Sequence, residues 1–258
     1  PGCFSDRAGA YFQRYGQETT RHAMASWYAQ AIENARLCPS AQEYHNTHPD
    51  PLSLGMISPD PRVFTENLNV YDCSKVSDGA SSIVLLSEKG LKRHKLSLQD
   101  TVEIVGFAQI TDNLTEKPKD LTRLDTIAQA SCQVIQKAGI TLKDIALFEI
   151  HDCFTIAAIL IIEAIGLATQ GQGPEFILNG NTGRKGAFPM NTTGGLIGWG
   201  HPTGATGVHQ AVTIWEQLTG KAGDAQIKTD PKRPYGMSIN MGGDDKTAVV
   251  ILYKQLQA

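Results

Sequence analysis

Long apolar runs and an excess of positive charge are both missing from the 258-residue sequence. The most apolar run, 154–162, stops at Glu163 and is too short to cross a bilayer, so it predicts a buried helix. The 23 Lys and Arg residues are outnumbered by 26 Asp and Glu, which gives a net charge of −3. We therefore expect neither a membrane nor a nucleic acid as a partner.

Cysteine is scarce, and its five positions are scattered: Cys3, Cys38, Cys73, Cys132 and Cys153. An odd, scattered set does not resemble a disulfide framework, which favours a reducing compartment. The sequence begins at Pro1 without an initiator methionine and without a charged and then apolar leader. We therefore expect a fragment, or a chain numbered from its first ordered residue, with no visible targeting signal.

Common metal and nucleotide motifs are also missing. There is neither a CxxC pair nor an H-E-x-x-H helix, so a metal site built from His151, Cys153 and His201 is not expected. The glycine-rich stretch 191–207 matches neither the G-x-G-x-x-G nor the P-loop spacing, so its glycines predict tight turns and close backbone approach instead.

Apolar residues occur in patterns typical of alternating helices and strands. Their spacing predicts helices over 20–36, 122–138, 155–167 and 208–218, and strands over 80–87, 101–110, 145–150, 236–240 and 246–254. Five prolines between 39 and 61 predict an irregular segment there. Thr122 and Asp125 resemble a capping box, and Gly139 is expected to end that helix. The alternation favours an α/β fold with a mostly parallel sheet.

The first candidate site is the tetrapeptide His151-Asp152-Cys153-Phe154, between a predicted strand and a predicted helix. Loops at the carboxyl ends of strands are the usual position of sites in α/β proteins. A cysteine at a helix start is exposed to unpaired N–H groups that favour the thiolate. A half-buried cysteine beside a turn-capping Asp152 explains the same pattern.

The second and third candidates are glycine-rich. His201 is the only titratable side chain in 191–207, where a strand is expected to pass into a helix. It is either a positioned acid–base group or a structural histidine. The segment 240–246 places Gly242 and Gly243 between two predicted strands, where a simple hairpin is the alternative to a site.

Taken in order, these three segments resemble the thiolase superfamily. HDCF at 151–154 stands in the place of the family's NEAF motif, and 200–202 is its GHP motif. Met241-Gly242-Gly243 falls where the family has CxG. HDCF together with a missing CxG cysteine resembles the sterol-carrier-protein type of thiolase. The segments 41–45 and 72–87, together with the helix predicted over 20–36, resemble the part that joins the two thiolase halves.

The resemblance implies a layered α-β-α-β-α sandwich built from two βαβαβαββ halves. By this plan residues 1–77 are the loop domain, 78–90 hold the last strand of an otherwise missing N-terminal half, and 91–258 are the complete C-terminal half. No cysteine here occupies the family's CxS context, which carries the nucleophile. Because one orphan strand makes no stable sheet, we expect the missing half as another chain, a cleaved piece or a further segment.

The resemblance also implies CoA-dependent cleavage of a 3-ketoacyl-CoA, or the reverse Claisen condensation to acetoacetyl-CoA. His201 would lower the pKa of the nucleophilic cysteine and donate to an oxyanion, and His151 would hold a water that shares this oxyanion. Cys153, with a pKa tuned toward neutrality, would shuttle the proton. Gly243 would offer its backbone N–H to a second oxyanion hole. Ser74 would contact the pantetheine arm of CoA, although an ordinary turn serine is its alternative.

The implied partners are acyl-CoA, CoA as a substrate, the missing N-terminal half and a second subunit in a homodimer. No permanently bound cofactor is implied, and the implied location is mitochondrial or peroxisomal. The chain alone is expected to be inactive. Two alternatives stay open: a CoA-ester-binding protein that kept the fold and lost catalysis, and a ketoacyl-synthase-like condensing enzyme, against which HDCF argues.

Overall fold

One four-stranded sheet organises the C-terminal part of the chain in the computed structural model, which describes residues 1–256. Its strands are β1 (Val102–Thr111), β2 (Ile145–Ile150), β3 (Tyr235–Gly242) and β4 (Thr247–Gln255), in the order β1-β4-β3-β2. Only β2 and β3 pair in parallel, whereas β1 with β4 and β3 with β4 are antiparallel. The expected mostly parallel sheet is therefore wrong, because a tight turn joins β3 directly to β4.

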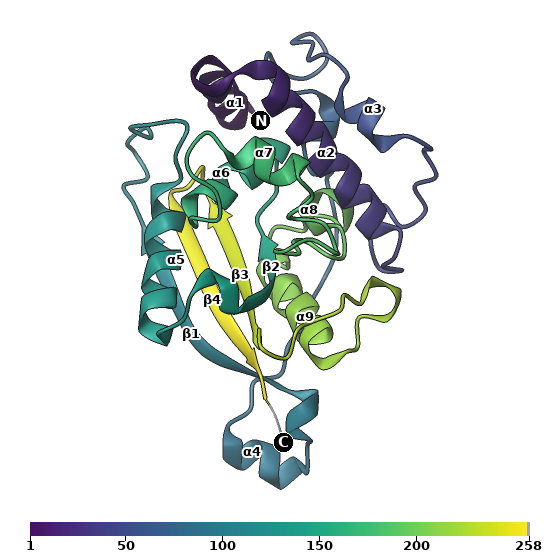
Figure 1. The fold of residues 1–258 in the computed structure, drawn as a ribbon, viewed down its shortest axis with the longest axis vertical. Coiled ribbons are helices and arrows are strands. Elements are labelled where there is room, and N and C mark those ends of the chain that lie inside the picture. The colour runs from purple at the N-terminus through teal and green to yellow at the C-terminus, as the bar shows by residue number, and fades with distance from the viewer. Residues whose placement is uncertain (257–258) are drawn as a thin grey trace.

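Helices cover both faces of this sheet (Figure 1). One face is covered by α5 (Asp125–Ala138) and the other by α9 (Thr206–Thr219). Beyond them, α6 (Thr155–Ala164) packs on α5, α7 (Gly173–Leu178) packs on α6, and α8 (Gly195–Gly198) packs on the N-terminal helices. Residues on β4 alternate between the two sides: Val250 and Leu252 join the cluster under α5 and α6, whereas Tyr253 joins the cluster under α9. This alternation is the period of two that a strand covered on both faces requires.

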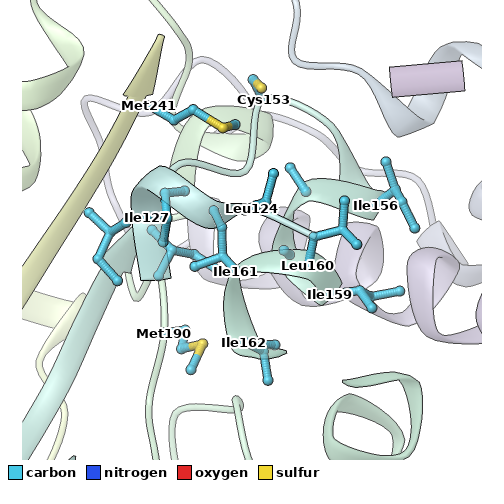
Figure 2. Packing of buried hydrophobic residues seen from close by; sticks show 14 of the residues in the cluster. Leu124, Ile127, Cys153, Ile156, Ile159, Leu160, Ile161, Ile162, Met190 and Met241 are labelled. Atoms are coloured by element: carbon cyan, nitrogen blue, oxygen red, sulfur yellow. The ribbon is translucent and has the colours of Figure 1, made fainter. Parts of the chain in front are cut away.

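Helix α6 lies at the centre of the larger cluster, as its uninterrupted apolar sequence predicted. All residues from Thr155 to Ile162 are buried, and Figure 2 shows Ile156, Ile159 and Leu160 among the packed side chains. The same cluster holds Cys153 and Met241, so the core of this half reaches the candidate site.

The start of α5 differs from the predicted capping box. Leu124 is the N-cap residue and makes no side-chain cap. Instead, the Asp245 carboxylate accepts hydrogen bonds from the backbone N–H groups of Thr126 and Ile127, at 3.0 and 3.2 Å. Gly139 ends the helix in the left-handed conformation, as expected.

The N-terminal part is helical, with α1 (Gly2–Tyr15), α2 (Gln17–Ala35) and α3 (Pro51–Gly55). The first of these was not predicted, whereas α2 was. Glycines bring α2 very close to the glycine-rich loop. A Cβ atom at Gly198 would lie 2.5 Å from the Ala31 carbonyl oxygen, and one at Gly194 would lie 2.8 Å from the Ala35 Cβ.

The strand predicted over 80–87 is not formed, because these residues have no regular secondary structure and no neighbouring strand. Their apolar side chains face solvent, with Val84 83% and Leu85 70% exposed. Helix α4 (Glu88–His94) follows and stands away from the body of the molecule (Figure 1). Short 3₁₀ turns span Val70–Asp72, Leu98–Asp100, Leu142–Asp144 and Gly223–Ala225. Among residues 1–256, no helix is both long and apolar enough to cross a membrane.

Candidate active site

The HDCF segment follows β2 directly and precedes α6, as predicted. His151 is buried, and its Nδ1 atom has no hydrogen-bond partner among the described residues. Burial, reinforced by the nearby His201, lowers the pKa of His151 to about 3. The ring is therefore neutral at physiological pH and has a free hydrogen-bonding position for a small ligand or water.

His201 lies in the loop between α8 and α9 rather than after a strand. Its Nδ1 atom is 2.8 Å from the Thr206 hydroxyl, and that hydroxyl donates to the Pro202 carbonyl at 3.1 Å. Since the hydroxyl has only one proton, it accepts from His201, which places the imidazole proton on Nδ1. Burial lowers the pKa of His201, so its Nε2 atom carries a free lone pair.

The fold brings the two histidines together from different loops. The rings of His151 and His201 meet edge to face, with centroids 5.0 Å apart. Both are held neutral by burial, so the pair can accept a proton or share one polar ligand without charge repulsion. This is the arrangement that a base and a ligand-holding histidine of one site require.

Cys153 is buried at the start of α6, one residue before the N-cap Phe154. Burial, and then the charge of Asp152, raises the pKa of the Cys153 thiol. The expected tuning toward neutrality is therefore wrong for this chain, because desolvation outweighs the helix start. The group is a protonated thiol at neutral pH, so it is not a nucleophile; it holds a proton, although the raised pKa makes it a weaker acid.

The segment 73–77 crosses both candidate loops, and we call it the crossing strap. The backbone N–H of Ser74 donates to the Cys153 carbonyl at 2.9 Å. The Ser77 hydroxyl accepts from the His201 backbone N–H at 2.9 Å and donates to Gln42 at 2.7 Å. The strap therefore places the predicted Ser74 beside Cys153, and it adds Ser77, which the sequence analysis missed.

Asn191 is a second residue that the sequence analysis did not select. It adopts the left-handed conformation with φ of 49°, and its side chain pairs with the backbone of Ile150 in both directions, at 2.7 and 3.1 Å. It thereby fixes the start of the glycine-rich loop to the end of β2. An asparagine at a loop start was its only sequence signal, since asparagine tolerates this conformation.

Gly243 lies in the turn between β3 and β4, with φ of 61° and an exposed position. The turn is a simple hairpin, as the alternative interpretation held. Within residues 1–256 no hydrogen bond joins Gly243 to His151 or His201. Its link to the site is Met241, whose side chain is in the same buried cluster as Cys153 (Figure 2).

A groove of about 420 Å³ opens next to the GHP motif. One wall is formed by residues 77–81 and the other by 202–205, so the groove continues from the crossing strap along the loop that holds His201. In the described part of the chain, no group of three or more His, Cys, Asp or Glu side chains is placed to hold a metal ion.

Comparison with known proteins finds thiolases. The family model for thiolase C-terminal domain-like proteins matches residues 108–255. An acetyl-CoA acetyltransferase of Methanothermobacter thermautotrophicus is 32% identical over 257 residues, which cover 99% of this chain and 63% of the relative. Sterol carrier protein 2 of Rattus norvegicus is 30% identical over 260 residues, which cover 98% of this chain and 45% of the relative. The chain thus spans about half to two thirds of the length of these relatives.

Solved structures show the same fold. The Ltp2-ChsH2(DUF35) aldolase superimposes with a TM-score of 0.77 at 19% identity, covering 99% of this chain and 63% of that one. A monomeric SCP2-thiolase-like protein of Mycobacterium smegmatis gives a TM-score of 0.69 at 18% identity, covering 99% and 51%. The expected α/β, thiolase-like fold is thereby confirmed. The chain belongs to the thiolase superfamily, and sterol carrier protein 2 is among the relatives to which it is similar.

Proposed function

We propose that this chain is the C-terminal part of an enzyme that cleaves 3-ketoacyl-CoA with CoA, or runs the reverse condensation to acetoacetyl-CoA. The observation that carries the proposal is the edge-to-face pair of neutral histidines at the HDCF and GHP positions. A protonated thiol, Cys153, is adjacent to the same HDCF loop. Cleavage of a C–C bond beside a thioester needs a sulfur nucleophile, a stabilised oxyanion and a proton donor.

The chain supplies the last two of these requirements. The free Nε2 of His201 would take the proton of an incoming thiol, and the resulting imidazolium would donate to the oxyanion. His151, with its unpartnered nitrogen, would hold the water that shares this oxyanion. The Cys153 thiol would protonate the departing enolate. The Gly243 N–H would serve a second oxyanion hole, and each such donor is worth on the order of 3 kcal/mol of barrier.

The groove beside the GHP motif supports an acyl-CoA substrate. Its walls are residues 77–81, which continue the crossing strap that holds Ser74, and residues 202–205, which follow His201, so the groove lies where the pantetheine arm of a CoA ester could bind. CoA is then a substrate that leaves after each turnover. A homodimer and a mitochondrial or peroxisomal location are parts of this proposal that depend on the resemblance alone.

The nucleophile would come from a part that the 258 residues do not contain. Exposed apolar surface supports such a partner: α9 covers β2 and β3, whereas Phe107 of β1 is 67% exposed on the neighbouring part of the sheet. The unpaired segment 80–87 adds further exposed apolar side chains. Apolar patches of this kind mark interfaces in soluble proteins. We expect the chain alone to have no thiolase turnover.

A chimaera tests the proposal, with this chain placed after the N-terminal part of the archaeal acetyltransferase. We expect it to cleave acetoacetyl-CoA with CoA, whereas the chain alone does not.

In this chimaera, His201→Asn should lower kcat by about 10² or more without loss of folding. Cys153→Ala should still form an acyl-enzyme with acetyl-CoA, seen as a mass increase, while acetoacetyl-CoA turnover falls by about 10²–10⁴.

The second candidate is acyl-CoA binding without catalysis. The observation that favours it is that burial raises the pKa of Cys153 rather than activating it. A folded chimaera that binds acetoacetyl-CoA but does not turn it over would favour this candidate. Turnover by the 258-residue chain alone would instead contradict the assignment of roles.

A further inference from the structure

A buried carboxyl group, that of Asp152, lies between His151 and Cys153, the two HDCF residues that have roles in the proposed mechanism. The Asp152 side chain is fully buried. It accepts a hydrogen bond from the Trp27 indole N–H at 2.9 Å and one from the Leu196 backbone N–H at 2.7 Å. Trp27 belongs to α2, and Leu196 belongs to α8, the short helix just before His201. One side chain thus joins three segments that are distant in sequence.

The glycine-rich loop is shaped to receive this carboxylate. Gly195 has φ of 61°, and a Cβ atom there would lie 2.7 Å from both Asp152 carboxylate oxygens. Any side chain at this position would therefore collide with the carboxylate, in addition to the strain of the left-handed backbone. The close approach allows the Leu196 N–H to reach Asp152 without a water between them.

Asp152 shares the interior with a second acid, Glu149 on β2. Burial raises the pKa of Asp152 to about 6, although hydrogen bonds from Leu196, Trp27 and Asn191 oppose this rise. Burial, and then the charge of Asp152, raises the pKa of Glu149 well above its usual value, and only the Thr192 N–H opposes it. Asp152 receives more hydrogen bonds than Glu149, so of the two acids Asp152 ionises more readily.

We propose that Asp152 is a positioning residue that locks the HDCF loop to α2 and to the loop of His201, and so sets the meeting of the His151 and His201 rings. A buried carboxylate must keep its N–H donors, because an unpaired charge in the interior is very costly. Each donor is rigidly attached to a different segment. The position of His151, adjacent to Asp152, is therefore fixed relative to both the loop domain and His201. The functional meaning rests on the proposed function, whereas the locking itself is measured without substrate.

Four variants of the full chain test this inference: Asp152→Asn, Trp27→Phe, the double variant and Glu163→Gln. In Asp152→Asn the amide cannot accept from both N–H donors, so either Trp27 or Leu196 loses its acceptor. Trp27→Phe removes the indole N–H, so in the double variant the introduced amide can turn its oxygen to Leu196. Glu163→Gln is the control for a buried carboxylate changed to an amide elsewhere, because Glu163 accepts from Gly171, Gly173 and Tyr11 through one oxygen and lies at the far end of α6.

The readouts are hydrogen exchange of the 194–201 peptide, the ring NMR signals of His151 and His201, and thermal melts. We expect Asp152→Asn to speed exchange of 194–201 by at least about tenfold, and to shift both ring signals. The double variant should recover most of the protection, although it lacks two native groups. Glu163→Gln should leave the peptide and the ring signals unchanged.

Equal effects of Asp152→Asn and Glu163→Gln on the peptide and the rings would overturn the inference, as would a double variant worse than Asp152→Asn. If Asp152→Asn does not fold, Trp27→Phe alone decides: faster exchange of 194–201 with shifted ring signals supports the lock, and unchanged values overturn it. An inactive chimaera with intact locking would contradict the proposed function only. An active chimaera with unchanged exchange in these variants would contradict the lock only.

Discussion

At the scale of single residues, the state of His201 depends on one hydroxyl group. Thr206 is buried, donates to the Pro202 carbonyl and accepts from His201 Nδ1. This chain of two hydrogen bonds selects the tautomer in which Nε2 is the free base. In the role proposed for His201, a fixed tautomer needs no reorganisation before the ring takes a proton.

The hydroxyl of Thr206 can be removed without a change of shape. Thr206→Val should leave His201 as a mixture of tautomers, which ¹⁵N chemical shifts of the ring measure directly. In the active chimaera we expect kcat to fall by about tenfold or more, because His201 Nδ1 loses its hydrogen bond to the Thr206 hydroxyl. Thr206→Ser restores the hydroxyl and should restore both the tautomer and the rate. A Val variant with wild-type ring shifts would contradict the assignment.

The lowered pKa of His151 makes a prediction about stability against pH. The folded chain holds fewer protons on this ring than the unfolded chain, so its contribution to stability is lost as pH falls from about 6.5 toward 3. At pH 5 the loss is about 2 kcal/mol relative to pH 7.5.

Urea unfolding at the two pH values, compared between wild type and His151→Asn, isolates this contribution. The variant should lose less stability on acidification. The raised pKa of Asp152 acts in the opposite direction, since its protonated form favours the fold, but it is common to both proteins and cancels in the difference. An identical pH dependence in the two proteins would show that His151 titrates normally.

How much of the site could be predicted depends on how far each signal extends along the chain. HDCF and GHP are contiguous motifs, so His151, Cys153 and His201 could be selected from sequence. Ser77 and Asn191 act through hydrogen bonds to distant backbone, which leave no local pattern. Burial of Cys153 by the surrounding core was also invisible, and so the direction of its pKa was predicted wrongly.

At the scale of elements, the packing of α2 on the glycine-rich loop is the contact that places the site. Gly198→Ala would place a methyl group 2.5 Å from the Ala31 carbonyl oxygen. This oxygen belongs to the backbone of α2, so it cannot easily move away. We expect a loss of about 1–3 kcal/mol in the free energy of unfolding, measured by denaturant titration.

Gly204→Ala is the matched control for this substitution. It lies in the same loop, and no atom lies within 4 Å of its added Cβ. Its stability should stay close to that of wild type. If both variants lost the same stability, the cause would be the general cost of removing glycine from the loop rather than the contact with α2.

The elements that were predicted correctly are those whose own sequence decides them. Helix α6 is apolar on every side, and β2 is a short apolar run, so neither depends on its neighbours for recognition. Strand direction depends on which strands become neighbours, and the pattern over 101–110 and 246–254 contains no such information. The run over 80–87 has strand composition, but a strand needs a pairing partner, and none is present among residues 1–256.

At the scale of the whole molecule, the exposed apolar surface predicts how the chain behaves alone. Phe107→Glu replaces a side chain that is 67% exposed on the sheet face. We expect the variant to stay monomeric at concentrations where the wild-type chain self-associates, as measured by light scattering. In the chimaera the same substitution should destabilise the packing of the two parts and lower the melting temperature.

Val63→Glu is the control for this experiment, because Val63 is 70% exposed but lies in the N-terminal irregular segment. It should affect neither self-association nor the chimaera. If the Phe107→Glu variant self-associates like wild type, self-association uses another surface, and 80–87 is the next segment to alter.

The strand order β1-β4-β3-β2 has a consequence for synthesis on the ribosome. The two central strands are the last to be made, while β1 and β2, at the two edges, emerge first and have no hydrogen bonds to each other. A nascent chain that ends before Tyr235 therefore has no sheet on which α5 and α9 can pack. The C-terminal hairpin supplies the two central strands and so completes the fold. A chain that stops before this hairpin would expose an open core to degradation machinery instead of forming a nearly finished domain.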